Sequence, residues 1–269
     1  MWLNRATLHQ VAVVGVGSMG SAIIQSIKKS RNMVSIIGTV TSLDDAKAKF
    51  QKFKVPIHDS NKYLKGTKTA IIAVKPDKVE KVCQELKTHL PVDSTVVSVA
   101  AGIPLDRYYD LLGNERFIAR CMPNISISTG SGAITWHCRS DHIAIFDRLL
   151  FDLFYPNSLY MLDSDKKIDE STVISGCSPA VISWLCRSAL TKSNGALSAD
   201  ETLSLIRSSL VGTAKLLEQN TVDEIFDLVA PSGGVTDSMI SYYKKKCVHE
   251  ILEEGLHVAD NRIDKLKSF

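Results

Sequence analysis

Several features are missing from the 269-residue sequence, and each absence narrows the classes of protein to consider. Six cysteines occur, but no two of them form a C-x-x-C pair, and none lies near histidines at the spacing of a zinc site. A charge excess is also missing, because 32 Lys and Arg stand against 29 Asp and Glu, a net charge of +3. Such a weak balance argues against a nucleic-acid or anionic membrane surface. We therefore expect no metal ion and no nucleic-acid partner.

Long apolar runs are missing as well. No stretch approaches the roughly 18–20 consecutive apolar residues of a membrane-spanning helix. The first 10 residues lack the apolar core of a signal peptide. Unpaired cysteines, most of them within apolar runs, fit a reducing compartment. These absences predict a soluble, cytoplasmic chain without membrane contact.

The composition is that of an ordinary globular protein, with 45% apolar and 23% charged residues. The length suits two domains. In the first part, short β-branched runs alternate with segments of helical spacing, which is typical of a parallel sheet with helical crossovers. The strands expected are 11–14, 33–37, 69–74, 94–99, 117–119 and 133–136. The helices expected are 21–29, 43–53, 77–90 and 104–112. The predicted fold class is α/β, with an N-terminal Rossmann-type doubly wound sheet followed by an all-α dimerisation domain.

The pattern changes at a polar segment, 163–169, which we interpret as a boundary between domain 1–164 and domain 165–269. Beyond it, apolar residues recur every three or four positions, and strand-like alternation disappears. One such stripe consists of Leu203, Ile206, Leu210, Ala214 and Leu217. Several of these faces are too apolar to stand alone, so the helices are expected to pack against a partner.

The strongest single motif is a glycine pattern at the end of the first strand, Gly15-Val16-Gly17-Ser18-Met19-Gly20. It fits G-x-G-x-x-G, in which the first glycine permits a tight turn, the second admits a pyrophosphate and the third lets helix and strand pack closely. The pattern alone is weak, but here it lies between a valine-rich strand and an amphipathic helix. We therefore expect Gly15, Gly17, Ser18, Met19 and Gly20 to bind a dinucleotide.

At the end of the second strand, an acidic residue would select NAD because its carboxylate accepts a hydrogen bond from the ribose 2′-hydroxyl. The sequence has Thr39, Thr41 and Ser42 there, with no acid before Asp44 and no arginine clamp. Hydroxyl groups and backbone N–H groups suit a 2′-phosphate, which favours NADP(H), with NAD(H) as the alternative. Ser42 is also expected to cap the next helix, and both roles can hold together.

Further motifs together resemble the pyrroline-5-carboxylate reductase family over nearly the whole chain, from about residue 11 to residue 266. The A-V-K-P and M-P-N elements are far more specific than the glycine pattern. The motifs that carry the resemblance are Ala73-Val74-Lys75-Pro76, Ser98-Val99-Ala100-Ala101-Gly102-Ile103, Arg120-Cys121-Met122-Pro123-Asn124, Gly176-Cys177-Ser178-Pro179-Ala180, Gly212-Thr213-Ala214-Lys215 and Val229-Ala230-Pro231-Ser232-Gly233-Gly234-Val235-Thr236.

The resemblance implies reduction of 1-pyrroline-5-carboxylate to L-proline by hydride from NAD(P)H. It also implies a homodimer with interlocked helical domains, or a higher oligomer built from it. Val74, Lys75 and Pro76 resemble the loop along the cofactor, and Ala100 and Ala101 resemble the strand end beside the nicotinamide. Asn124 resembles a polar contact nearby. Asn61 resembles the residue that touches the adenosine ribose, although helix capping is an equal alternative for it.

The substrate side is expected in the helical half. Gly233 and Gly234, with Val235 and Thr236, can turn backbone N–H groups toward the carboxylate of an imino acid, or they form a plain glycine-rich turn. Ser178 is expected either to contact the ring or to cap a helix. No catalytic acid–base pair is identified, because a protonated imine already carries the positive charge that makes its carbon electrophilic.

Departures from the family pattern concentrate at this substrate side. Trp184 stands where many members have a hydroxyl, and Arg187 where an acid is common. The indole could fill space that a ring needs, or face the bundle core. Pro231 and Ser232 are exchanged relative to the family, and Val235 replaces a hydroxyl. Two alternatives therefore stay open: a reductase of a different cyclic imine or imino acid, and a non-catalytic NADP-binding paralogue.

Overall fold

The computed structural model describes residues 10–30, 34–192 and 196–268. Contacts within the chain define two compact units. The first continues to Pro179 and resumes at Ala259, and the second comprises Ala180–Val258. Both borders fall inside helices. These units reflect contacts within one chain, so the predicted domain boundary at 164/165 stays a prediction.

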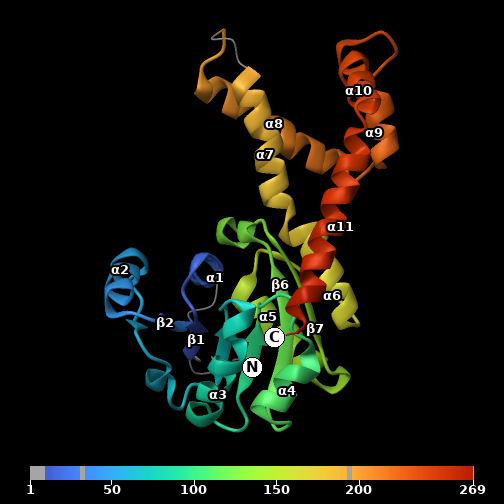
Figure 1. Ribbon diagram of the computed structural model, residues 1–269. Coiled ribbons are helices and arrows are strands. Elements are labelled where there is room, and N and C mark those ends of the chain that lie inside the picture. Colours follow the sequence, from blue (N-terminus) through green and yellow to red (C-terminus); the bar gives the residue numbers. More distant parts are fainter. Residues whose placement is uncertain (1–9, 31–33, 193–195, 269) are drawn as a thin grey trace, which may run out of the picture. The chain divides into compact units, whose positions relative to one another are not determined.

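The first unit is built on an eight-stranded sheet of order β3-β2-β1-β4-β5-β6-β7-β8 (Figure 1). Its first six strands have the order of a dinucleotide-binding sheet and run parallel, which confirms the Rossmann-type expectation. β7 is antiparallel to β6, and β8 is parallel to β7. The strands are β1 (Gln10–Val14), β2 (Ser35–Thr39), β3 (Ile57–His58), β4 (Thr69–Ile72), β5 (Thr95–Ser98), β6 (Phe117–Pro123), β7 (Ala133–Cys138) and β8 (Ser158–Met161).

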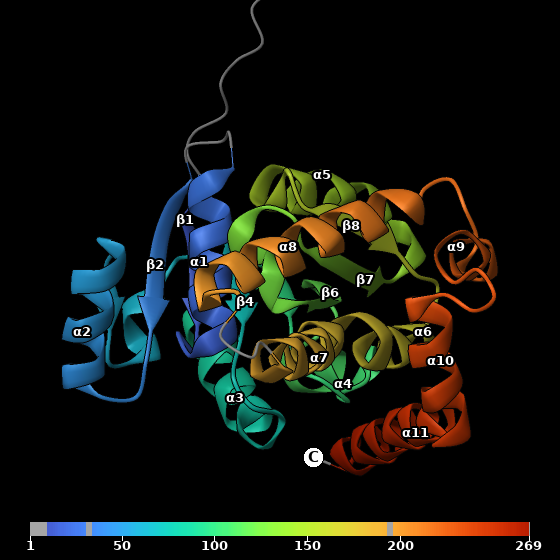
Figure 2. The same ribbon diagram turned by 90° about the horizontal axis from the view of Figure 1, so that it is seen from above.

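Helices cover both faces of the sheet, because its strands send apolar side chains alternately to either side (Figures 1 and 2). In β1, Val11 and Val13 pack with α1 (Ser18–Lys29), α2 (Leu43–Phe53) and α5 (Ile143–Phe154). Ala12 and Val14 pack with α3 (Val79–His89) and α4 (Leu105–Leu112). The two clusters hold the strand ends in fixed register.

Some elements differ from the sequence expectations. α1 begins at Ser18, three residues before the predicted start, and β6 continues to Pro123, four residues beyond the predicted end. β3, β8 and α5 were not predicted. The predicted start of the second strand, Met33, lies outside the described residues. β3 is only two residues long and β8 lies at the sheet edge, largely exposed, so neither has the apolar run of a central strand.

A continuous helical run follows the sheet, beginning with α6 (Asp165–Ser171) and ending with α7 (Ser178–Lys192). A π turn, Thr172–Gly176, joins the two helices. Pro179 has no N–H to donate to the carbonyl four residues before it, so regular α-helical bonding cannot continue through this point. α7 begins at Ser178, as the Ser178-Pro179 pair predicts, and the Ser178 hydroxyl donates to the carbonyl of Ile174 in the preceding π turn.

This run, Asp165–Lys192, is long and apolar enough to cross a membrane by length and composition alone, with a mean hydropathy of 1.3 over 18 residues. The run contains serine, threonine and arginine residues throughout, so it holds no stretch of 18–20 consecutive apolar residues, and the sequence expectation stands. Only 6% of the window is buried within the chain, so its apolar surface is largely uncovered.

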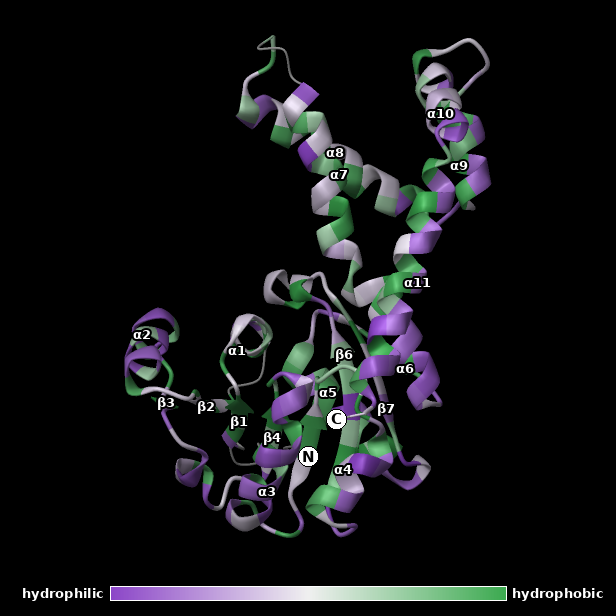
Figure 3. Ribbon diagram, in the orientation of Figure 1, coloured by the Kyte–Doolittle hydropathy of each residue, from purple (hydrophilic) through white to green (hydrophobic). Residues whose placement is uncertain are grey.

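The second unit contains helices and no strand among its described residues, as predicted. Besides α7 it takes in α8 (Ala199–Leu216), α9 (Val222–Val229), α10 (Val235–Lys245) and the first part of α11 (Val248–Leu266). Thr202 is its only buried residue among those described. Figure 3 shows hydrophobic residues along α7, α8 and α11, and Trp184, Leu228 and Val258 are each more than 60% exposed. A helical unit with so little buried surface needs a partner to be stable.

Candidate functional site

The glycine loop between β1 and α1 uses its three glycines in three ways. Gly15 has φ +92°, and an added Cβ would lie 2.6 Å from Val74 Cγ1. At Gly20 an added Cβ would overlap the Gly15 carbonyl, so this glycine allows the helix to approach the strand. At Gly17, in contrast, an added Cβ would have nothing within 4 Å. Open space is therefore found at the one glycine that a pyrophosphate would approach.

The first turn of α1 supplies the donors for such a group. The N–H groups of Gly15 and Val16 both donate to the Thr39 carbonyl, at 3.0 and 3.1 Å, which ties the loop to β2. The first hydrogen bond of the helix is donated by the Ser21 N–H to the Gly17 carbonyl. The N–H groups of Ser18, Met19 and Gly20 precede it and have no helical acceptor. No acid lies in this first turn, so the helix end presents only positive partial charge to an anion.

Thr39 and Asn61 meet at the end of β2, where a ribose is expected. The Thr39 hydroxyl donates to Asn61 Oδ1 at 2.7 Å, and Asn61 Nδ2 donates to Glu85 Oε2 at 2.8 Å. Asn61 is therefore not a helix cap. That alternative is wrong, because Ser60 caps the short 3-10 turn Asn61–Leu64.

Thr41 and Ser42 follow β2 and are both exposed. The Ser42 hydroxyl accepts from the Asp45 N–H at 3.2 Å, which confirms its expected role as the cap of α2. Its own O–H and the Thr41 hydroxyl stay available as donors to a phosphate.

The ends of β4 and β5 lie beside the glycine loop, because β4 pairs with β1 and β5 pairs with β4. Val74, Lys75 and Pro76 follow β4, and Lys75 precedes a short 3-10 turn. Ala100, Ala101 and Gly102 follow β5.

Gly102 carries a contact that sequence reasoning did not anticipate. It has φ +78°, and an added Cβ would lie 2.5 Å from Leu266 Cβ and 3.1 Å from the Ile263 carbonyl. The last turns of α11 therefore pack directly on the loop that follows β5. Ile263 is buried at this contact.

Asn124 follows β6, one strand further from the glycine loop. Its Nδ2 donates to Ser175 Oγ at 3.3 Å, and its Oδ1 accepts from the Ala133 N–H at 3.4 Å. The side chain thus connects the β6–β7 corner to the π turn. The predicted cofactor residues lie at the carboxyl ends of β1, β2, β4, β5 and β6 or in the segments that follow them, except Asn61, which follows β3.

A buried ionic cluster was missed by sequence reasoning. Arg120, 2% exposed, makes ion pairs with Asp165 and with Asp169, the second at 2.8 Å. Lys267 lies 3.3 Å from Asp169, and the Leu105 N–H donates to both Asp165 oxygens. Burial lowers the pKa of Arg120, but the hydrogen bonds that its guanidinium donates to the two carboxylates outweigh this effect, and the pKa lies above its ordinary value. An arginine within an otherwise apolar strand was the available sequence signal.

The predicted substrate loop lies in the second unit, before α10. Gly233 has φ +77°, and its N–H donates to Asp237 Oδ2 at 2.9 Å. The Gly234 N–H donates to the Pro231 carbonyl at 2.9 Å. The glycines are therefore bonded within the loop, and the donors without helical partners are those that begin α10, at Val235 and Thr236. Val235 is 91% exposed, so its side chain is free of packing within the chain.

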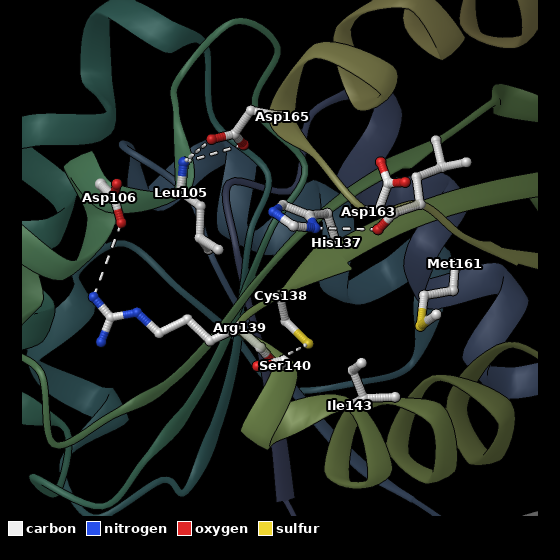
Figure 4. Close-up of a pocket in the computed structure, with 11 residues that line it drawn as sticks. Leu105, Asp106, His137, Cys138, Arg139, Ser140, Ile143, Met161, Asp163 and Asp165 are labelled. Carbon is white, nitrogen blue, oxygen red and sulfur yellow. Dashed lines mark hydrogen bonds and ion pairs between the residues drawn. The ribbon is translucent and has the colours of Figure 1, made fainter.

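A pocket of about 360 Å³ lies elsewhere in the first unit (Figure 4). Its lining includes His137, Arg139, Asp163 and Asp165, and none of the predicted site residues. Figure 4 shows the Arg139–Asp106 pair and the contact of His137 Nδ1 with the Leu162 carbonyl, 3.1 Å. These groups are already paired within the chain. Across the described ranges, no three His, Cys, Asp or Glu side chains are grouped to hold a metal ion.

Taken together, a doubly wound sheet, an open second glycine and a helix N-terminus without acids define the class of dinucleotide-binding Rossmann proteins. Comparisons with known proteins identify the family within this class. Residues 10–102 match the family model described as NADP oxidoreductase coenzyme F420-dependent, and residues 165–266 match pyrroline-5-carboxylate reductase dimerisation. A pyrroline-5-carboxylate reductase from Pisum sativum is 30% identical over 234 residues, 85% of each chain. The chain belongs to the pyrroline-5-carboxylate reductase family.

Two further relatives cover more of its length. The Aquifex aeolicus pyrroline-5-carboxylate reductase is 26% identical over 265 residues, which is 96% of this chain and 97% of the relative. A crystal structure of Plasmodium falciparum pyrroline carboxylate reductase with NADP bound has a TM-score of 0.85 at 20% identity. It covers 96% of this chain and 99% of its own, and at this identity it supports the fold.

Proposed function

We propose that this protein reduces 1-pyrroline-5-carboxylate to L-proline with hydride from NAD(P)H, as an enzyme of proline biosynthesis. The observation that carries the proposal is the agreement between family membership over most of the chain and the glycine loop. The family supplies the reaction, and the loop supplies an open anion site at the carboxyl end of β1.

NADP(H) is the cofactor we favour, with NAD(H) as the alternative. The N–H groups of Ser18, Met19 and Gly20 would hold the pyrophosphate, with Gly17 leaving room for it. Thr41 and Ser42 would donate to a 2′-phosphate, and the Thr39–Asn61 pair would border the ribose. Val74–Pro76, Ala100, Ala101 and Asn124 would line the nicotinamide half. When bound, the reduced dinucleotide supplies a hydride.

The chain's own contribution is binding, orientation and exclusion of water. Reduction of a protonated imine needs no general base, because the substrate carries its own positive charge. The N–H groups that begin α10, at Val235 and Thr236, would bind the substrate carboxylate, aided by the positive helix end. The Gly233–Gly234 turn that precedes α10 would border the ring.

We further propose that the second unit forms a homodimer. Its residues match a dimerisation model, and its helices carry large apolar side chains that the chain itself leaves uncovered. A second copy would cover the apolar run Asp165–Lys192 as well as α8. The apolar surface of that run would then be buried against protein and would not require a membrane. A cytoplasmic location stays a prediction.

The direct test is consumption of NADPH, followed by absorbance, with pyrroline-5-carboxylate as substrate and L-proline identified as product. Gly233→Asp places a carboxylate beside the predicted carboxylate site, so the KM for substrate should rise at least about tenfold while NADPH affinity is kept. Binding of NADPH without turnover of any imine would instead indicate a non-catalytic paralogue.

A different cyclic imine or imino acid is the second candidate. It is favoured by Val235, which offers no hydroxyl, and by the Gly233 N–H, which is bonded to Asp237. A panel of five- and six-membered cyclic imines distinguishes the two. The first candidate requires the highest kcat/KM on pyrroline-5-carboxylate.

A further inference from the structure

The Arg120 cluster, comprising Arg120, Asp165, Asp169 and Lys267, lies in the first unit and touches none of the residues proposed to contact cofactor. It nevertheless joins three segments that are distant in sequence. Arg120 comes from β6, the two aspartates belong to α6, and Lys267 follows α11. Nothing in the reduction itself requires these charges, so their place in the molecule needs another reason.

Asp165 and Asp169 are four residues apart, so both carboxylates lie on one face of α6 and meet one guanidinium. That guanidinium is rigid and forked, so holding two carboxylates fixes the rotation of the helix about its axis as well as its position. A lysine ammonium is a single point charge and cannot fix both.

The helix fixed in this way continues into the π turn Thr172–Gly176. A π turn inserts one extra residue and so rotates the side chains that follow it. Its Ser175 hydroxyl lies 3.3 Å from Asn124 Nδ2. A second hydrogen bond, between the Ser171 and Thr135 hydroxyls at 2.7 Å, pins the same run to β7. Asn124 comes only four residues after Arg120, at the corner that directly follows β6.

We infer that Arg120 is a positioning residue for reduction: with Asp165 and Asp169 it sets the rotation of α6, and through the π turn this places Ser175 so that it orients the Asn124 amide. The inference rests on the proposed function, in which Asn124 borders the nicotinamide. Arg120 itself touches neither cofactor nor substrate.

The chain offers a matched control in Arg116, a second buried arginine that precedes the same strand. Its guanidinium donates to the carbonyls of Leu112, Lys87 and Leu90 and to the Ser94 hydroxyl. These partners lie away from α6 and the π turn. Arg116→Lys therefore removes a buried guanidinium without disturbing the path to Asn124.

The first experiment needs neither cofactor nor substrate. The side-chain amide resonances of Asn124 are recorded in the free, full-length protein by ¹⁵N correlation spectroscopy and assigned with Asn124→Asp. Ser175→Ala, which removes the acceptor, and Arg120→Lys should both shift these resonances, whereas Arg116→Lys should leave them in place. An unmoved Asn124 signal in folded Arg120→Lys overturns the inference. If Arg120→Lys does not fold, Asp169→Asn takes its place with the same expected shift.

The second experiment measures turnover per folded enzyme. Arg120→Lys and Ser175→Ala should each lower kcat about tenfold, with the KM for NADPH within about twofold, because the pyrophosphate and ribose contacts lie on other strands. The double variant should be no slower than Arg120→Lys alone, since both act on one path. Multiplied losses in the double variant, or a loss in Arg116→Lys equal to that in Arg120→Lys, overturn the inference. Wild-type protein that turns over no imine refutes the proposed function, and the resonance experiment then decides the inference by itself.

Discussion

Gly15, Gly17 and Gly20 lack a side chain for different physical reasons, and only one of these reasons concerns a ligand. At Gly15 the backbone conformation and Val74 leave no room, and at Gly20 the Gly15 carbonyl leaves none. At Gly17 the room exists and stays open. Gly15 and Gly20 are therefore glycines because the fold leaves no room for a methyl group. Gly17 is a glycine because a bound cofactor needs the space that a methyl group would take.

Cofactor choice is also decided by single residues. Thr41→Asp would place a carboxylate beside the proposed 2′-phosphate, and repulsion between like charges should weaken NADPH binding about tenfold, or roughly 1.4 kcal/mol. NADH carries a 2′-hydroxyl and should bind as well as before or better. Titration of both dinucleotides gives the ratio of dissociation constants. An unchanged ratio would exclude this position from 2′-phosphate recognition.

The buried thiol of Cys83 predicts a pH dependence of stability. Burial raises the pKa of Cys83 from 9.0 to about 12. Above pH 9 the unfolded chain loses this proton while the folded chain keeps it, so the contribution to stability is full below pH 9 and is lost as the pH rises toward 12. The free energy of unfolding should fall by about 1.4 kcal/mol per pH unit in that window for this thiol.

Urea unfolding at a series of pH values from 8 to 11 measures the slope. Cys83→Ala should reduce the slope by the same amount, although burial also raises the pKa of Cys121 and of Cys138 (the latter to about 11), so part of the dependence stays. Equal slopes in the wild type and Cys83→Ala would show that the thiol titrates alike in both states.

At the scale of elements, α1 and β1 are joined where Gly20 meets Gly15. Gly20→Ala gains about 1 kcal/mol of helix propensity but forces a methyl group into a backbone carbonyl. We expect a net loss of about 3 kcal/mol in the free energy of unfolding. Denaturant titration measures it, and a variant as stable as the wild type would mean that α1 does not approach β1 this closely.

Periodicity in the sequence located most of the central elements, since buried parallel strands and amphipathic helices leave a local pattern. β1, α2 and the strand ends that carry the glycine loop were predictable in this way. β8 was not, because an exposed edge strand has no apolar run, and neither was the π turn, which depends on Pro179 and on contacts with β6 and β7. Arg120 was visible in the sequence only as a charge in an apolar strand. Its partners, Asp165 and Asp169, become its neighbours only when the chain folds.

At the scale of the whole molecule, the second unit leaves apolar faces uncovered. The α8 stripe is the clearest sequence feature there, and its Leu210 is 43% exposed in the single chain. Burying a leucine contributes about 1.5–3 kcal/mol, and a symmetric dimer contains two copies of each such contact. The stripe can therefore account for a substantial part of the association energy.

Leu210→Asp should accordingly raise the dissociation constant of the homodimer at least about 100-fold. Ser208→Asp is the matched control, because it adds the same charge to the opposite side of the same helix. Sedimentation over a range of concentrations gives both constants. A wild-type chain that sediments as a stable monomer of 29.5 kDa would contradict the proposed assembly.

The measurement that tests the central claim most directly is NADPH titration of wild type, Gly17→Ala and Gly20→Ala, with unfolding free energies measured in parallel. If a pyrophosphate rests on the first turn of α1, Gly17→Ala should lower NADPH affinity at least about tenfold while costing at most about 1 kcal/mol of stability. Gly20→Ala should lose mainly stability. NADPH that binds Gly17→Ala as tightly as the wild type, or that does not bind the wild type at all, would contradict the account.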